Sequence, residues 1–144
     1  GQLLSDSLNN TQIKQAYNYY INDSYWLLSP LKLEEPGVKV LLDDPEEIDG
    51  SPYQVLHINF DKTAQNAGDQ YWLYVDPASG QIVRSRVLQQ GKKEAGIYKW
   101  TNYKDLGGGL KLSTRKQNIN QNYAVTFPVA SVLISVEPDK FTKK

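Results

Sequence analysis

The sequence predicts an α+β domain, in which a curved antiparallel sheet of about seven to eight strands forms an incomplete barrel and an N-terminal helix covers its concave face. Three observations lead to this prediction. Apolar residues have helical spacing near the N-terminus, whereas strand-like segments follow residue 37 and continue to the end. Short turn sequences separate these segments, as in an antiparallel meander. Both faces of the central segments are largely apolar, which indicates cover on both sides or curvature around a cavity.

Composition favours one domain, residues 1–144, of a size that buries a core without disulfides or metals. Sixteen basic and sixteen acidic residues balance, so nothing in the net charge favours a nucleic acid partner. The absence of cysteine excludes disulfides, thiolate metal sites and cysteine nucleophiles. The sequence also holds no apolar run near the roughly 20 residues that cross a bilayer, so we predict no transmembrane segment.

The N-terminal region carries little pattern, and we expect residues 1–10 to be poorly structured or the remnant of a tag. The chain contains no methionine and begins with Gly1, which indicates a fragment or a processed form. A signal peptide, a lipid anchor or more of the fold could precede it.

A helix is predicted over "TQIKQAYNYYINDSYWLL", where Ile13, Ala16, Tyr17, Tyr20 and Ile21 follow the spacing of an amphipathic stripe. The run 22–24 (Asn-Asp-Ser) favours turns and interrupts the stripe. Pro30 prevents an uninterrupted helix beyond about residue 29. We therefore expect one helix followed by a short second helical turn.

Eight segments rich in β-branched and aromatic residues are predicted as strands: 38–42, 53–60, 71–76, 81–90, 96–103, 110–117, 123–127 and 129–136. Turn chemistry between them predicts loops, including a solvated loop at "DDPEEIDGSP". The segments "QIVRSRVLQQ", with Arg84 and Arg86, and "LKLSTRKQ" are more polar. We expect them at sheet edges or on a convex outer face.

Candidate catalytic groups are few. His57 is the single histidine and lacks partners at catalytic or metal-ligand spacing, so we expect it to be structural or to line a cavity. The acidic run lacks the ligand spacing of a calcium loop, and "GGG" leads into a strand, which predicts a hairpin turn and no phosphate site. Asp61 and Asp69 would have to converge in a cleft to support hydrolysis. We predict no catalytic residue, metal or cofactor.

Aromatic residues are abundant: ten Tyr, three Trp and three Phe. They can build a core or line a site for an apolar or saccharide ligand. The residues that we predict to line a cavity come from the helix and from one set of strand faces: Tyr17, Tyr20, Tyr25, Trp26, Leu27, Tyr53, Val55, His57, Trp72 and Tyr74.

Five stretches resemble, in order, an uncharacterised family of bacterial cell-envelope proteins: "INDSYWLLSPLKLEEPGVKV", "DGSPYQVLHINFD", "DQYWLYVDPASGQIVRSRV", "KWTNYKDLGGGLKLSTRK" and "ISVEPDKF". The resemblance runs from about residue 17 to residue 141. That family is in turn similar to the LolA/LolB lipoprotein-carrier superfamily, whose members share an incomplete, strongly curved antiparallel β-barrel with helices over an apolar cavity.

The resemblance implies export to the periplasm or outer membrane, with a signal peptide or lipoprotein anchor, and binding of an apolar ligand such as an acyl chain. It also implies further N-terminal strands and a helix that this chain lacks. It brings no catalytic residues and no lipoprotein transport. Two alternatives remain open at this point: a structural module that docks a protein partner of the envelope through a sheet edge or an aromatic strip, and an enzyme acting on polysaccharide or peptide.

Overall fold

The computed structural model describes residues 6–64, 66–132 and 135–137, with side chains from residue 10 onward. It begins with one helix, α1 (Asp6–Leu28), and a 3-10 turn, η1 (Ser29–Leu31). Seven strands follow: β1 (Val38–Ile48), β2 (Ser51–Phe60), β3 (Gln70–Val75), β4 (Ile82–Leu88), β5 (Gly96–Asp105), β6 (Lys111–Asn118) and β7 (Ala124–Thr126). The predicted fold class, a curved antiparallel sheet with an N-terminal helix, is confirmed.

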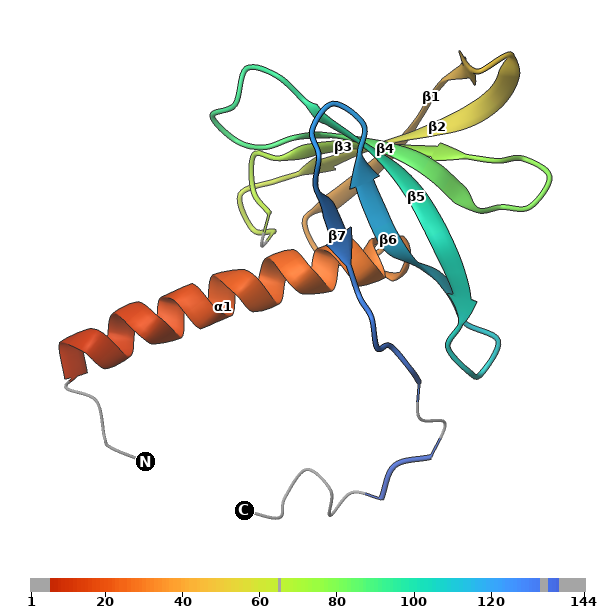
Figure 1. The fold of residues 1–144 in the computed structure, drawn as a ribbon. Helices are drawn as coiled ribbons and strands as arrows, with labels where there is room; N and C mark the ends of the chain where they lie inside the picture. Colours follow the sequence, from red (N-terminus) through yellow and green to blue (C-terminus); the bar gives the residue numbers. More distant parts are fainter. Residues whose placement is uncertain (1–5, 65, 133–134, 138–144) are drawn as a thin grey trace.

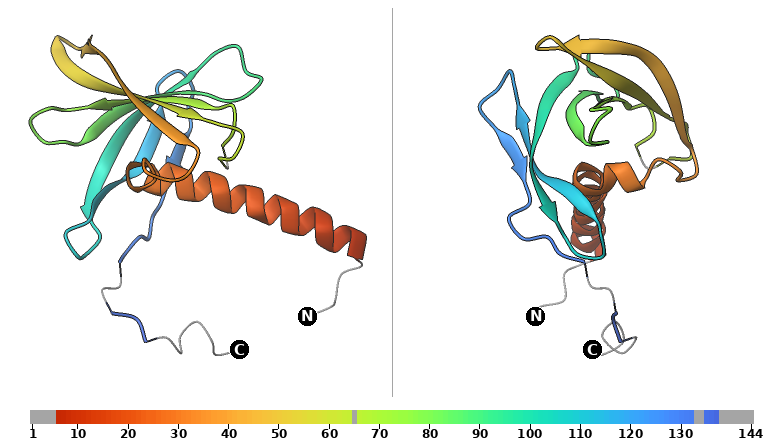
Figure 2. Two further views of the ribbon diagram at one scale, coloured as in Figure 1. Left: turned by 180° about the vertical axis from the view of Figure 1, so that it is seen from behind. Right: turned by 90° about the vertical axis from the view of Figure 1, so that its right-hand side faces the viewer.

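The strands form a single meander in the order β1 to β7, and each pairs antiparallel with the next. The sheet curves strongly without closing into a barrel, and the C-terminal half of α1 lies on its concave side (Figure 2). The N-terminal half of α1 projects beyond the sheet (Figure 1), and residues 10–20 are exposed accordingly. The helix therefore covers the concave face with its last turns alone.

The predicted interruption of the helix at residues 22–24 is wrong, because α1 continues through them to Leu28. Ser24 donates its hydroxyl hydrogen to the carbonyl oxygen of Ile21, 3.0 Å away, so the side chain bonds back within the helix and does not open a turn. Asn22 and Asp23 point to solvent. The predicted stop before Pro30 is confirmed, since η1 replaces the α-helix at Ser29.

The predicted loop at "DDPEEIDGSP" is also wrong, because β1 extends through residues 43–48 and pairs with the start of β2. Asp49 and Gly50 have φ values of 53° and 78°, as in the two-residue turns that match the twist of a hairpin. The pairing register shifts between Asp43 and Glu46, and this bulge accommodates Pro45 on an edge strand.

The C-terminal strand predicted at 129–136 is not present among its described residues, 129–132 and 135–136; residues 133 and 134 lie outside the described chain. β7 is limited to three residues. Among the residues of this segment that the structure describes, Val132 donates its N–H to the carbonyl of Leu106 (2.7 Å) and so ties the segment to the domain. Val129 is 88% exposed, so the segment buries too little surface to act as a further strand.

The core lies between the concave face and the helix. It consists of a buried aromatic and aliphatic cluster: Tyr25, Ile58, Phe60, Leu73, Ile82, Val87, Tyr98 and Trp100. Asn102 has a positive φ of 53° in the middle of β5. This local reversal of strand geometry lets Trp100 and Tyr103, three residues apart, both pack against the cluster.

The polar strands do not sit at the sheet edges. β4 is the central strand, and its Arg84 and Arg86 lie on the face opposite the helix, as the convex-face alternative predicted. β6 is more buried than expected, and the side chain of Lys116 is fully enclosed. The prediction of a solvent-facing β6 is therefore wrong at Lys116, which takes the face of Leu112 because strand side chains alternate.

Candidate functional site

Tyr25 and Trp26 fill the space between helix and sheet. The ring of Tyr25 packs edge-on against Phe60, with centroids 5.3 Å apart, and lies 5.5 Å from Tyr71. Trp26 makes an edge contact with Tyr98 at 4.7 Å. The cavity that remains between these rings and Trp100 measures about 10 Å³, close to the volume that one water molecule needs. No ligand fits beneath the centre of the helical cover.

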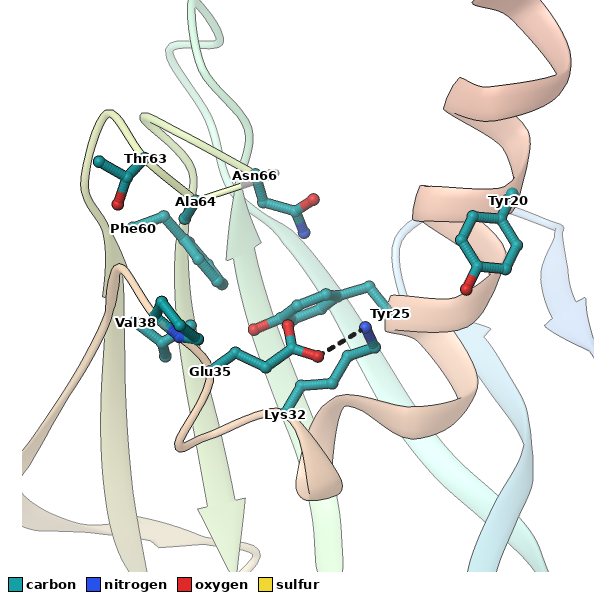
Figure 3. A pocket seen from close by; sticks show the side chains of 10 residues that line it. Tyr20, Tyr25, Lys32, Glu35, Val38, Phe60, Thr63, Ala64 and Asn66 are labelled. Carbon is teal, nitrogen blue, oxygen red and sulfur yellow. Dashed lines mark hydrogen bonds and ion pairs between the residues drawn. The ribbon is translucent and has the colours of Figure 1, made fainter. Parts of the chain in front are cut away.

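A larger pocket of about 430 Å³ opens beside Tyr25, where the end of α1 and the turn after η1 meet the start of β1, the end of β2 and the loop after β2 (Figure 3). Its lining mixes aromatic and aliphatic side chains with polar ones, and a lysine and a glutamate stand at one side. The lining residues are Tyr20, Tyr25, Lys32, Glu35, Pro36, Val38, Phe60, Thr63, Ala64 and Asn66.

Gly37 fixes the wall of this pocket. It has a φ of +83°, and its carbonyl accepts the N–H of Asp61 (2.9 Å), which ties the start of β1 to the loop after β2. A Cβ at this position would lie 2.6 Å from the carboxylate of Asp61 and 2.7 Å from the hydroxyl of Thr63. Only glycine permits this approach.

Asp61 organises the loop itself. Its Oδ1 accepts the backbone N–H of Thr63 (2.8 Å) and the Thr63 hydroxyl (2.5 Å). These hydrogen bonds, that of the hydroxyl first, hold the pKa of the Asp61 carboxyl below its ordinary value. The loop therefore keeps its conformation by an Asx-type turn, and Ala64 and Asn66 are held at the pocket.

The hydroxyl of Tyr25 is buried and has no hydrogen-bond partner within the described chain. Burial, together with the nearby negative charge of Glu35, raises the pKa of this phenol far above its ordinary value. The group is thus a neutral donor at any physiological pH. Figure 3 shows the ring extending from α1 to lie between Phe60 and Glu35, so the residue lines the pocket while its hydroxyl oxygen stays enclosed.

Lys32 and Glu35 form an ion pair at the same pocket, with Nζ 3.0 Å from Oε1, drawn as the dashed line in Figure 3. Lys32 also lies 5.8 Å from the centroid of the Tyr25 ring, within cation–π range. The pair has no net charge, but its negative member, Glu35, is the one that acts on the Tyr25 phenol. The pocket therefore combines aromatic side chains and a paired charge with an unsatisfied hydroxyl enclosed beside it, which suits a partly apolar ligand that carries a hydrogen-bond acceptor.

The other predicted cavity residues divide between two places. On the helical side, Tyr17 and Tyr20 are more than half exposed, and Leu27 is partly buried. On the strands, the pairing registers place the whole predicted set on the face opposite the helix: Tyr53, Val55, His57, Trp72 and Tyr74. The structure does not bring this set together with Tyr25 and Trp26. Phe60 and Tyr71, from the alternate set, face the helix instead.

On that outer face, His57 stacks on Trp72 with centroids 4.5 Å apart, and the Arg86 guanidinium lies 4.1 Å from the Trp72 centroid. The two ring nitrogens of His57 face Asp43 Oδ2 (3.5 Å) and Gln70 Oε1 (3.2 Å). Tyr74 donates its hydroxyl hydrogen to Glu46 (2.9 Å). These contacts account for the histidine as part of a packed surface ladder, as in the structural alternative predicted for it.

Asp61 and Asp69 do not share a cleft. Asp61 serves the turn at Thr63, whereas Asp69 accepts the N–H of Gln90 (2.8 Å) and binds the loop after β2 to the end of β4. No group of three His, Asp or Glu side chains is placed to hold a metal ion within the part of the chain that the structure describes. In that same part, no helix is long and apolar enough to cross a membrane.

A second open pocket, of about 440 Å³, lies on the other side of Trp26, between the β4–β5 and β6–β7 connections. Its lining is more polar and includes amide side chains. Tyr98 and Tyr123 share a hydrogen bond between their hydroxyls (2.7 Å), and Asn118 donates to the Tyr123 oxygen (3.2 Å). Because these polar groups already bond one another, this pocket has fewer free donors to offer a ligand than its hydrophilic lining suggests.

No protein-family model, no curated protein and no solved structure matches this chain. The resemblance to the LolA/LolB superfamily stays a prediction.

Proposed function

We propose that this protein is a non-enzymatic, exported envelope protein that binds an apolar ligand, such as an acyl chain, in the pocket beside Tyr25. The observation that carries the proposal is the unpartnered Tyr25 hydroxyl, which is enclosed beside a pocket lined by Phe60 and Val38. A buried hydroxyl without a partner is costly, and a ligand that displaces the side chains over it and offers an acceptor would relieve that cost.

The chemistry of the pocket narrows the ligand. A volume of about 430 Å³ lies within the range of small-molecule sites. Its aromatic side chains favour an alkyl chain, and the neutral donor of Tyr25 favours an ester, amide or hydroxyl oxygen. Glu35 stands beside that donor and raises the cost of a negative charge there. We therefore favour an acyl ester over a free carboxylate.

The proposal is tested by titrating the protein with a fluorescent long-chain acyl ester. Val38→Trp fills the pocket and should abolish binding, whereas Val129→Trp places the same ring on an exposed segment and should leave binding unchanged. Tyr25→Phe should weaken binding by roughly fivefold to tenfold, the value of one hydrogen bond. Absence of binding by the wild type, or equal binding by Val38→Trp, contradicts the proposal.

A second candidate function is an interaction module of the envelope with no small-molecule ligand. The half of α1 that projects beyond the sheet favours it, because it exposes large side chains such as Ile13 (59%) and Tyr19 (59%). Capture of an envelope protein that Ile13→Asp and Tyr19→Asp abolish, and that Gln12→Asp leaves intact, would support this function. Trp26→Ala is a poor probe, because Trp26 packs against Tyr98 inside the fold.

A further inference from the structure

β1 is the first strand of the sheet, and within the described residues no strand pairs with its outer edge. Its first half also exposes three consecutive apolar side chains: Val40 at 37%, Leu41 at 55% and Leu42 at 71%. An edge with free backbone donors and acceptors, flanked by apolar side chains, is a template for another strand.

We propose that this edge pairs with β1 of a second copy of the chain, antiparallel and about a two-fold axis, so that two sheets join into one. A two-fold contact requires a surface that complements itself. The strand meets this requirement in its length, its side chains and its charges.

The usable length of the edge fixes the register. Gly37, with its φ of +83°, precedes the strand, and Pro45 lacks the N–H that a ladder needs. The bulge between Asp43 and Glu46 bends the strand at the same place. Residues 38–44 remain available, and the two-fold register that pairs all of them sets Leu41 opposite Leu41 of the other copy.

The charged residues of β1 support the same register, independently of the usable length of the strand. With Leu41 on the axis, Lys39 of each copy lies opposite Asp43 of the other, which gives two ion pairs across the interface. Lys39, Leu41 and Asp43 share one face of the strand, because alternate residues do so. On the other face Val40 lies opposite Leu42, so both sides of the new pair are complementary.

His57 reinforces the arrangement. Its Nδ1 lies 3.5 Å from Asp43 Oδ2, and Asp43 still exposes 40% of its side chain. The carboxylate is therefore oriented by its own sheet and remains open to an incoming lysine. A single-residue slip would set Lys39 opposite the neighbouring Asp44, but it would also place Val40 opposite Asp43 and Val38 opposite Pro45. The apolar match and the backbone ladder, together with the charges, therefore favour the register centred on Leu41.

Cysteine cross-linking tests the register, because the native chain contains no cysteine and any disulfide must join two copies. Opposed residues in an antiparallel pair have Cα atoms about 4.5 to 5.5 Å apart, within disulfide range. Leu41→Cys should form a covalent dimer on mild oxidation. Ala78→Cys, exposed in the β3–β4 turn, is the matched control and should stay largely monomeric.

Charge exchange tests the contact itself, with mass measured by light scattering or sedimentation across a concentration series. The wild type should double its mass as concentration rises. Lys39→Glu should weaken the dimer about tenfold, and Lys39→Glu combined with Asp43→Lys should restore it, because the exchanged pair recreates both contacts. A monomer at all concentrations, a dimer indifferent to these changes, or equal cross-linking at residue 78 would overturn the proposal.

Discussion

The ammonium group of Lys116 lies 4.5 Å from the centroid of the Trp100 ring in the interior of the protein. It donates to the carbonyl oxygen of Ser113 (2.5 Å), and Phe127 covers it with a ring centroid 5.5 Å away. Among the described residues no carboxylate forms an ion pair with it. One hydrogen bond and two aromatic faces replace the hydration shell of this charge.

This enclosure predicts a specific dependence of stability on pH. Burial lowers the pKa of Lys116 to about 8, from 10.5 for an ordinary lysine. Between these values the unfolded chain binds a proton that the folded protein does not. The free energy of unfolding therefore rises with pH from about 8 to about 10.5, and below pH 8 the full desolvation cost remains.

Lys116→Met should stabilise the protein at pH 7 by roughly 3 kcal/mol at most, since it removes a charge that is buried without a counter-ion. Its advantage should shrink as pH rises toward 10.5. Denaturant unfolding of both proteins at several pH values measures the difference between their free energies of unfolding. The tyrosines also titrate at high pH, but both proteins contain them, so their contribution cancels from this difference. A constant difference across this range would mean that Lys116 is not the titrating group.

Ser85 on β4 and Trp100 on β5 link these two neighbouring strands through the core. The indole N–H of Trp100 donates to the Ser85 hydroxyl oxygen at 2.9 Å, and both residues are buried. Ser85→Ala leaves this donor without a partner and should cost about 1 to 3 kcal/mol of stability. Ser51→Ala, at an exposed strand start, should change stability far less. Equal effects in urea unfolding would show that the buried bond contributes nothing.

Substitutions at Gly37 and Gly50 distinguish the stability cost of backbone strain from that of steric crowding, because both glycines have φ near +80°. A Cβ at Gly50 meets no atom within 4 Å, whereas one at Gly37 would collide with the loop at Asp61. Gly50→Ala should cost about 1 kcal/mol. Gly37→Ala should cost more and should also weaken acyl ester binding, since the loop forms the pocket wall. Thermal unfolding and ligand titration report the two effects separately.

The sequence predicts the layers of this fold better than their details. Pro30 ends the helix wherever the chain lies, because the restriction is local. The extension of β1 depended on Asp49-Gly50 forming a two-residue turn, and that turn chemistry is stronger evidence than the charged residues before it. Ser24 illustrates the opposite case, since its side chain can either open a turn or bond within a helix.

The site could be predicted only in part. Tyr25 lies on the last helical turn, where an aromatic side chain has to meet the sheet, and it packs on Phe60. The sequence does not show which face of β2 meets the helix, because both faces are apolar and a period of two fits either one. Phe60 lies on the helix side and His57 on the other. For Lys116 the sequence contains one indication of burial. It lies four residues after Leu112 and therefore on the same face of β6.

Tyr25 and Tyr103 provide a matched test of the unpartnered hydroxyl. Both rings pack at the core, but Tyr103 donates to the carbonyl of Ile82 (2.7 Å), and burial raises its pKa to about 12. Tyr103→Phe should therefore lose about 1 kcal/mol of stability, because it removes a made hydrogen bond and leaves a carbonyl unsatisfied.

Tyr25→Phe should leave the stability of the ligand-free protein unchanged or raise it, because its hydroxyl lacks a partner among the described residues. The same substitution should reduce the rise in melting temperature that a saturating acyl ester produces, since only the wild type can donate to the ligand. If Tyr25→Phe destabilises the free protein as much as Tyr103→Phe does, the hydroxyl has a bonding partner in solution, and its role as a ligand donor is refuted.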